Sequence, residues 1–259
     1  MSSFSFDRGQ FLIAGPCMIE SETTVFAVAD ALARLQQRTG IPVCFKASFD
    51  KANRAGVSSP RGPGMAEGLR VLAAARERTG LPVLTDVHEV HQVEPVAAVV
   101  DVLQIPAFLA RQTDLLIAAG ATRLPVNIKK GQWMSPEAML GAVEKVRTGA
   151  GRDIPVAVTE RGTFFGYGDL VVDFRSLPRM RGATRVPVIY DASHSVQQPG
   201  TAAGGASGGS RDLIPDLLFA AAAAGADGFF IETHPDPANA LSDAATQWPL
   251  DQLDQLVDT

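Results

Sequence analysis

Residues 81–88 read LPVLTDVH, and a phrase of the same kind recurs four more times along the chain. The other four are IPVCFKAS from Ile41, LPVNIKKG from Leu124, IPVAVTER from Ile154 and VPVIYDAS from Val186. Each phrase opens with a proline near its start, which suits the beginning of a strand, and continues as a short apolar run. Such a run is typical of a strand buried on both faces of a parallel sheet, and each phrase ends on polar or charged residues.

Three further segments follow the same logic without the leading proline: FLIAGPC from Phe11, VDVLQIPA from Val100 and DGFFIET from Asp227. Together these segments predict eight strands. Between them lie stretches with apolar residues at helical spacing, two of which end at Gly40 and Gly80, as a helix C-cap requires. The expected helices are Glu22–Arg38, Met65–Arg78, Val90–Val99, Thr113–Ala119, Pro136–Arg147, Asp169–Met180, Asp212–Ala224 and Leu250–Val257.

Strands that alternate with helices predict a parallel sheet. Eight such units in 259 residues predict a single (β/α)8 TIM barrel, with residues 1–259 forming one catalytic domain. A doubly wound open sheet is the alternative, but its first strand-to-helix turn would carry a glycine-rich G-x-G-x-x-G phrase. The turn here reads AGPCMIESE from Ala14 and lacks that phrase, so the closed barrel is the predicted fold.

The composition is ordinary for a globular enzyme. Hydrophobic residues make up 46% of the chain and the net charge is -5, so no global basic field favours nucleic acid. No apolar stretch approaches the roughly 20 residues that span a bilayer, and the N-terminus lacks the pattern of a signal peptide. Two cysteines, Cys17 and Cys44, do not make a disulfide framework. We therefore expect a cytoplasmic protein with neither nucleic-acid nor membrane partners.

In a barrel of this class the chemistry lies at the C-terminal ends of the strands. Read in chain order, those ends are rich in metal ligands, acids and cations: Cys17, Lys46, Asp86, Gln104, Lys129, Arg161, His194 and Glu232. The three basic members each directly end an apolar strand, which favours the binding of a small anion. In contrast, Lys130, Arg70 and Arg76 are interpreted as exposed charges that pair with Asp and Glu.

Four residues offer ligands for a metal ion: Cys17, His194, Glu232 and nearby Asp243. One sulfur, one nitrogen and carboxylate oxygens suit a borderline first-row ion. The alternative interpretations are a small buried hydrophobe for Cys17, a hydrogen-bonded loop histidine for His194, and a helix N-cap or solvated charge for Asp243. Cys44 lies inside a predicted strand and is expected to be a core residue.

Residues 195–211 read SVQQPGTAAGGASGGSR and show no periodicity. Loops of this length are uncommon without a role, although a flexible surface loop is the alternative. Because the segment follows the end of a strand, we predict a mobile lid over the mouth of the barrel.

Nine motifs together resemble those of 3-deoxy-D-manno-octulosonate 8-phosphate synthases. They are AGPCMIESE, FKASFDKANR, RGPG, TDVHE, QIPAFLARQTDL, VNIKKGQ, TERGTFFGYGDLVVDFRSLP, YDASHSVQQPG and ETHPDPANALSDAATQWPL. They follow the family's order from about Phe11 to about Leu253. The most telling is KANR at residues 51–54, because related DAHP synthases usually carry Lys-Pro-Arg there. The family's usual KANRSS reads KANRAG here, with Ala55 in place of a hydroxyl.

The resemblance implies condensation of phosphoenolpyruvate with D-arabinose 5-phosphate and water, which feeds KDO and lipopolysaccharide biosynthesis. The residues that it implies for phosphoenolpyruvate are Lys46, Ser48, Lys51, Gln104, Ala107, Lys129 and Arg161. Those implied for the sugar phosphate are Asn53, Arg54 and Asp86, with further anion contacts from Arg61 and Arg111. The residues expected to take part in catalysis are Lys46, Asn53, Asp86, His88 and His194.

The family has two classes, and the metal-independent class carries asparagine where this chain has Cys17. The chain therefore resembles the metal-dependent class, in which one divalent ion (Zn, Mn, Fe or Co) would be held by Cys17, His194, Glu232 and Asp243. The family also implies a homotetramer. One alternative is a DAHP synthase that uses erythrose 4-phosphate, against which Asn53 argues. Another is a catalytically silent barrel that binds a phosphorylated ligand, but it would be expected to have lost some of the basic strand ends.

Overall fold

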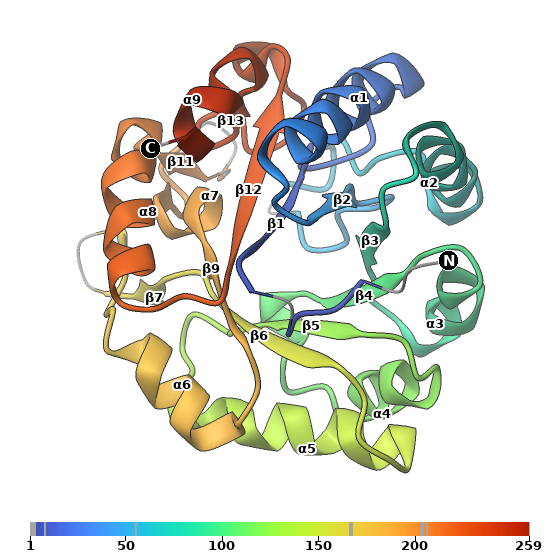
Figure 1. Ribbon diagram of the computed structural model, residues 1–259, viewed down its shortest axis with the longest axis vertical. Coiled ribbons are helices and arrows are strands. Elements are labelled where there is room, and N and C mark those ends of the chain that lie inside the picture. The colour runs from blue at the N-terminus through green and yellow to red at the C-terminus, as the bar shows by residue number, and fades with distance from the viewer. Residues whose placement is uncertain are drawn as a thin grey trace.

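The computed structural model describes residues 4–7, 9–54, 56–165, 168–202, 205 and 207–258. Eight parallel strands form a closed barrel that is surrounded by helices (Figure 1). The strands are β1 Phe11–Gly15, β2 Val43–Lys46, β3 Val83–Asp86, β4 Val102–Ile105, β5 Val126–Lys129, β6 Val156–Glu160, β9 Val188–Asp191 and β12 Gly228–His234. The predicted (β/α)8 barrel and its eight predicted strands are therefore confirmed.

The first and last barrel strands pair with each other and close the sheet. Leu12 of β1 lies opposite Val43 of β2 on one side and opposite Phe229 of β12 on the other. The remaining strands follow in the order β2-β3-β4-β5-β6-β9-β12. Because helices cover the outside and side chains fill the inside, the strands are buried on both faces. All strands run in one direction, so their C-terminal ends meet at one rim of the barrel.

Most of the helices connect consecutive barrel strands and cover the outer face of the barrel (Figure 1), whereas α7 lies at the rim beside the cavity and α9 follows the last strand. They are α1 Glu22–Thr39, α2 Met65–Thr79, α3 Val90–Ala97, α4 Thr113–Ala121, α5 Met139–Ala150, α6 Ser176–Thr184, α7 Ala192–Ser195, α8 Ile214–Ala223 and α9 Leu253–Asp258. Short 3-10 turns occur at η1 Ala107–Leu109, η2 Pro136–Ala138, η4 Arg211–Leu213, η5 Pro237–Asn239 and η6 Leu250–Gln252. As predicted, Gly40 and Gly80 cap α1 and α2, with positive φ values of 73° and 70°. Within the described residues, no helix is both long and apolar enough to cross a membrane.

The prediction of a helix over Asp169–Met180 was wrong in its first half. Leu170–Val171 forms β8, which pairs antiparallel with β7, Thr163–Phe164. Leu170 thereby turns into the interior, and a turn between the Ser176 N–H and the carbonyl of Asp173 precedes α6. The helix therefore begins only at Ser176.

Aromatic rings fill the N-terminal end of the barrel. The rings of Phe4, Phe6 and Phe11 contact one another with centroids 5.5 to 5.7 Å apart. They share a buried cluster with inward-facing strand residues, which are Ile13, Cys44, Leu84, Val102, Ala157, Ile189 and Phe230. Cys44 is thus a core residue, as predicted. Apolar packing at this end leaves the opposite end of the barrel to polar groups.

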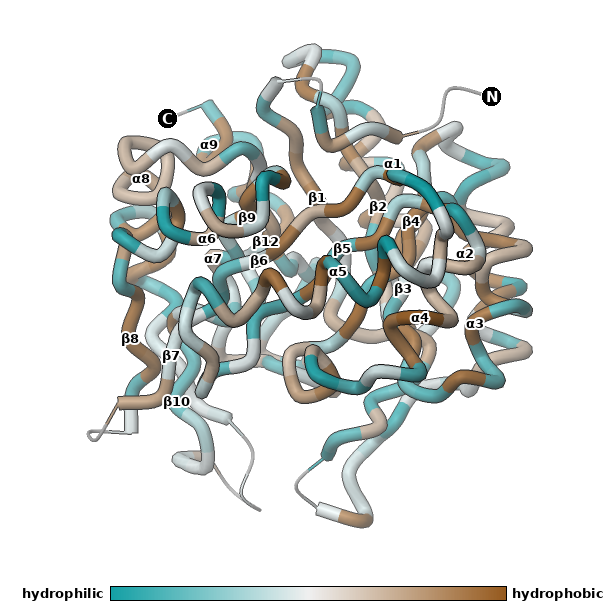
Figure 2. The backbone as a smooth tube through the Cα atoms, turned by 90° about the horizontal axis from the view of Figure 1, so that it is seen from below, coloured by the Kyte–Doolittle hydropathy of each residue, from teal (hydrophilic) through white to brown (hydrophobic). Residues whose placement is uncertain are grey.

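Short strand pairs extend the rim formed by the C-terminal ends of the barrel strands. The pair β7–β8 and the strand β10 (Gln197–Gln198) project from one end of the molecule in Figure 2. β10 pairs antiparallel with β11, Gly208–Gly209, and β13, Trp248–Pro249, adds to the outer part of β12. The segment predicted as a lid thus contains a small hairpin, and its residues face the cavity described next.

Candidate active site and metal centre

A cavity of about 590 Å³ lies at the C-terminal ends of the strands. Seven of the eight predicted strand-end residues line it, namely Lys46, Asp86, Gln104, Lys129, Arg161, His194 and Glu232. The eighth, Cys17, contacts two further lining residues, Ser242 and Asp243. The cavity is also lined by the predicted catalytic residue His88 and by the predicted substrate residues Ser48, Lys51, Asn53, Arg54 and Ala107. The closed barrel therefore gathers residues that lie more than 200 positions apart, such as Cys17 and Asp243.

Three of the predicted metal ligands form a tight group. One donor atom each from Cys17, Glu232 and Asp243 lies within 4.8 Å of the others. The Cys17 Sγ atom lies 3.2 Å from Oδ2 of Asp243. His194 lies at the edge of this group, with Nε2 3.7 Å from Glu232 Oε2 and 3.7 Å from Asp243 Oδ2. His194 therefore lies beside the group that the other three predicted ligands form.

The surrounding residues hold these ligands in place. Nδ1 of His194 lies 2.8 Å from Oδ2 of Asp191, and the backbone N–H of His194 donates to Oδ1 of the same carboxylate at 2.9 Å. The backbone N–H of Cys17 donates to Oε1 of Gln247 at 3.0 Å. Asp243 itself has a positive φ of 46°, a conformation that aspartate tolerates better than most residues.

The charges of the group fit a divalent cation. Oε2 of Glu232 is buried and has no hydrogen-bond partner among the described residues, which is costly for a carboxylate oxygen. Burial raises the pKa of the Cys17 thiol well above its usual value, and the carboxylates of Asp243 and Glu232 raise it further. A bound cation would reverse this effect, because it stabilises the thiolate and satisfies the carboxylates. Sulfur, nitrogen and oxygen donors together suit a borderline first-row ion.

Basic side chains form a second wall of the cavity, which adjoins the ligand group where Lys46 contacts Glu232. Lys46 lies 2.6 Å from Oε1 of Glu232, and Lys129 lies 2.5 Å from Oδ2 of Asp191. Burial lowers the pKa of Lys129 to about 8, although Asp191 favours its charged form. Arg161 is also buried, and its Nη1 atom has no hydrogen-bond partner within the described part of the chain. A buried guanidinium nitrogen without a partner is suited to bind an anion.

An acid and an imidazole lie beside these cations. Asp86 accepts a hydrogen bond from the Ser48 hydroxyl, and its Oδ2 lies 2.9 Å from Nε2 of His88. Burial alone would raise the pKa of Asp86, but the hydrogen bond to His88 and the charge of Lys51 lower it below its usual value. Burial likewise opposes the charge of His88, while Asp86 raises the pKa of His88. The pair therefore favours a carboxylate beside a protonated imidazole.

Comparison with known proteins shows the family to which this chain belongs. The sequence model of the DAHP synthetase I family matches residues 6–258. The chain belongs to this family. Relatives named 2-dehydro-3-deoxyphosphooctonate aldolase occur in Syntrophotalea carbinolica (54% identity over 93% of this chain and 86% of the relative) and in Nitratidesulfovibrio vulgaris strain DP4 (52%, 96% and 89%). A third, from Bordetella petrii, is 51% identical over 100% of this chain and 93% of its own. The resemblance inferred from the motifs is confirmed.

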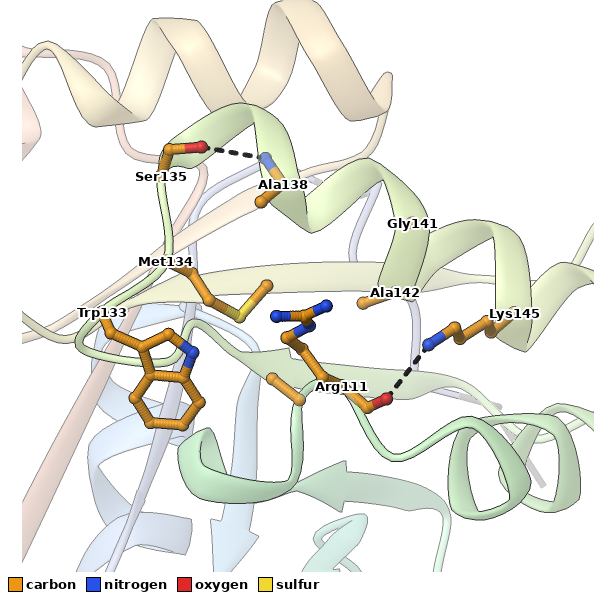
Figure 3. A pocket seen from close by; sticks show the side chains of 9 residues that line it. Arg111, Trp133, Met134, Ser135, Ala138, Gly141, Ala142 and Lys145 are labelled. Atoms are coloured by element: carbon orange, nitrogen blue, oxygen red, sulfur yellow. Dashed lines mark hydrogen bonds between the residues drawn. The ribbon is translucent and has the colours of Figure 1, made fainter.

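Two predicted anion contacts of this family member lie away from the main cavity. Arg61 is more than half exposed, and its Nε donates to Oδ1 of Asp50 at 2.8 Å. Arg111 lines a separate cavity of about 400 Å³ beside α5, together with Trp133, Met134 and Lys145 (Figure 3). Within one chain, the structure therefore does not bring these two arginines together with the other predicted residues. Ala55, the departure from the family's motif, lies outside the described residues.

One interpretation from the sequence was wrong in part. Lys130 pairs with an acid, as expected, but it is buried rather than exposed, with Nζ 3.5 Å from Oε1 of Glu160 and 3.1 Å from the Thr163 hydroxyl. It is buried because its side chain extends toward Glu160 and toward Thr163 of β7 instead of into solvent. Arg70 is confirmed as an exposed charge that pairs with glutamates, whereas Arg76 pairs with Asp101 as predicted but is partly buried.

The predicted lid lies at the cavity mouth. The lining residues that it contributes are Gln197, Pro199, Gly200, Ala202, Gly205 and Ser207. Its motion stays a prediction.

Three residues that contact the predicted site residues were not predicted from the sequence: Asp191, Gln197 and Gln247. Asp191 directly ends β9 and could have been found as a strand end, whereas the two glutamines are recognisable only by partners distant in sequence.

Proposed function

We propose that this chain condenses phosphoenolpyruvate with D-arabinose 5-phosphate and water to 3-deoxy-D-manno-octulosonate 8-phosphate and inorganic phosphate. This is the reaction of 3-deoxy-8-phosphooctulonate synthase, another name for the enzyme after which the relatives are named. The observation that carries the proposal is one cavity with two walls. One wall is cationic, and the other holds a sulfur–nitrogen–carboxylate ligand set.

The cationic wall suits phosphoenolpyruvate, which carries a carboxylate and a phosphate. Lys46, Lys51, Lys129 and Arg161 supply the positive charges, and Ser48, Gln104 and the backbone at Ala107 supply further polar contacts. The free Nη1 atom of Arg161 is the best-defined of these anion contacts. Held in this way, the substrate presents C2 and C3 to the rest of the cavity.

The sugar phosphate would occupy the wider part of the cavity. Asn53 and Arg54 line it there, and Arg54 is held by bonds to the carbonyls of Pro60 and Leu241. Arg61 and Arg111 remain proposed anion contacts. Arabinose 5-phosphate thereby places its aldehyde near the phosphoenolpyruvate, which converts the condensation into a reaction between positioned groups.

The second wall would hold one divalent ion, Zn, Mn, Fe or Co, through Cys17, His194, Glu232 and Asp243. When bound, such an ion supplies Lewis-acid polarisation of the aldehyde oxygen and orients the sugar. The chain's own contribution on this wall is that Asp191 caps the short helix α7 by accepting a hydrogen bond from the His194 N–H, which places His194 beside the other ligands.

Asp86 and His88 are the proposed groups for proton transfer. In the reaction water attacks C2 of phosphoenolpyruvate, C3 attacks the aldehyde carbon, and phosphate leaves by cleavage of its C–O bond. The attacking water loses both of its protons overall. One goes to the aldehyde oxygen, and the other leaves the hydroxyl on C2 as the ketone forms and goes to the departing phosphate. His88 Nε2, held 2.9 Å from Asp86, can carry a proton within the cavity.

The alternatives are less well supported. A DAHP synthase that uses erythrose 4-phosphate is disfavoured by Asn53 and by the names of the relatives. A catalytically silent barrel is disfavoured because all the basic strand ends are present and line one cavity. We further propose a single catalytic domain over residues 1–259, a homotetramer, a cytoplasmic location and a role in KDO and lipopolysaccharide biosynthesis.

The test is phosphate release from phosphoenolpyruvate with arabinose 5-phosphate, before and after treatment with a chelator. We expect turnover that disappears with chelator, returns with Mn²⁺ or Zn²⁺, and is absent with erythrose 4-phosphate. Cys17→Ala should lose metal retention, whereas Cys44→Ala, the matched buried control, should retain the metal. Turnover with erythrose 4-phosphate alone would refute the proposed sugar. Activity indifferent to chelator would refute the metal site.

A further inference from the structure

Gln197 connects the two walls of the cavity through a single side chain. Its Oε1 accepts a hydrogen bond from Nη2 of Arg161 at 2.6 Å, and its Nε2 donates to Oδ1 of Asp243 at 3.1 Å. Because a guanidinium can only donate and a carboxylate can only accept, the chemistry of the two partners decides the orientation of the amide. Gln197 is buried, so neither bond competes freely with water.

The atoms that Gln197 leaves unused are those that face ligands. Nη1 of Arg161 remains buried without a partner in the described structure. Oδ2 of Asp243 remains 3.2 Å from Sγ of Cys17 and 3.7 Å from Nε2 of His194. Each partner therefore gives one atom to Gln197 and keeps its other atom for an anion or a metal ion.

Asp243 needs such support because it does not lie on a helix or a strand. Its backbone has a positive φ of 46°. The hairpin that carries Gln197 also packs on the segment that follows Asp243, since a Cβ added at Gly209 would lie 2.2 Å from the Thr246 methyl group. Gln197 and Gly209 are paired in register in that hairpin. The hairpin and the ligand loop are thus fixed together.

We propose that Gln197 is a positioning residue that holds the anion-binding Arg161 and the metal ligand Asp243 in one arrangement. The inference rests on the proposed function of the same site. It predicts that loss of one amide weakens the binding of the metal and of phosphoenolpyruvate together. A contact that merely stabilised the fold would lower the melting temperature and leave both affinities unchanged.

The direct test is Gln197→Met, which keeps the length of the side chain and removes both hydrogen-bonding groups. Loss of an outer-shell partner typically costs about 10–100-fold in metal affinity, and we expect at least about tenfold here. We also expect the affinity for phosphoenolpyruvate to fall by about tenfold, since Arg161 loses its fixed orientation. Zn²⁺ affinity is measured by competition with a chelating dye, and phosphoenolpyruvate affinity by calorimetry without sugar.

Gln198→Met is the matched control. Gln198 is the neighbouring residue in β10, and its Nε2 donates to Oδ1 of Asp169 at 2.6 Å, away from the ligand set. This variant should keep both affinities. If Gln197→Met does not fold, Gln197→Asn tests the proposal instead. The shorter amide can reach at most one of Arg161 and Asp243, so the affinity for Zn²⁺ or for phosphoenolpyruvate should fall by about tenfold.

Two results are distinguishable. A folded Gln197→Met protein that keeps both affinities within about threefold of the wild type overturns the inference. The hydrogen bonds of Gln197 to Arg161 and Asp243 would then not be needed for binding. Wild-type protein that binds Zn²⁺ and phosphoenolpyruvate without condensing arabinose 5-phosphate refutes the proposed function instead, and leaves the role of Gln197 standing on the binding data.

Discussion

Two glycines allow α4 and α5 to approach each other along their backbones. A Cβ added at Gly149 of α5 would lie 2.0 Å from the carbonyl oxygen of Ile117, and one added at Gly120 of α4 would lie 2.0 Å from that of Val146. Gly141, which also lies in α5, would meet no described atom within 4 Å. The substitutions Gly149→Ala and Gly141→Ala are therefore the same chemical change in one helix. The first is expected to lower the stability of the protein and the second to raise it.

The magnitude follows from the distance. Ordinary contact begins at 3.4 Å, so in Gly149→Ala the two helices must separate by about 1.4 Å. The obstructing atom belongs to the backbone, and no change of rotamer relieves the overlap. Overpacking costs about 1–3 kcal/mol, and we place this case at the upper end. Alanine recovers about 1 kcal/mol of helix propensity, which leaves a net loss of about 2 kcal/mol.

Thermal unfolding followed by circular dichroism measures both variants. For a chain of this size, 1 kcal/mol shifts the melting temperature by about 2–4 °C. Gly149→Ala should therefore melt about 4–8 °C below the wild type, and Gly141→Ala about 2–4 °C above it. A Gly149→Ala protein that melts at or above the wild type would show that α4 and α5 do not pack at this distance.

The remaining predictions concern buried lysines. Because burial lowers the pKa of Lys129 to about 8, its charge should be lost as the pH rises through that value, and affinity for phosphoenolpyruvate should fall between pH 7 and 9.5. The unfolded chain, with the ordinary pKa of 10.5, binds this proton more tightly, so the stability contributed by Lys129 should rise between about pH 8 and 10.5. Calorimetric titrations at several pH values measure the affinity for phosphoenolpyruvate. In Lys129→Arg, which stays charged, this affinity should depend less on pH. A wild-type affinity that does not change with pH would contradict the prediction. For the pair of Lys130 and Glu160, Lys130→Met should lower the free energy of unfolding by about 3 kcal/mol, because Glu160 keeps its backbone hydrogen bonds but loses the buried ammonium that faces it. Lys130→Met combined with Glu160→Gln should recover most of that loss in urea unfolding, and an equally unstable double variant would argue against a buried ion pair.

Repetition made the barrel predictable from the sequence. The phrase that opens with a proline and continues as an apolar run marks strands such as β3 within a few residues, because a strand buried on both faces must be apolar throughout. Strands of two residues, such as β7 and β10, carry too little pattern to predict. They exist because neighbouring segments at the rim supply a partner, which is why the helix expected from Asp169 begins only at Ser176.

The sequence by itself determined which chemical groups stand at the strand ends, and the resemblance of its motifs to a known family indicated the class of reaction. Only the tertiary structure decided how those groups are held. Gln247 meets Cys17 across 230 residues, and Gln197 meets Asp243 across 46. Lys129 ends β5 and lines the cavity. Lys130 is the next residue, yet it pairs with Glu160 in the interior instead of facing the cavity. A residue type and its local pattern limit what a side chain can do, but closure of the barrel brings its partners within hydrogen-bonding distance, and burial then sets its charge.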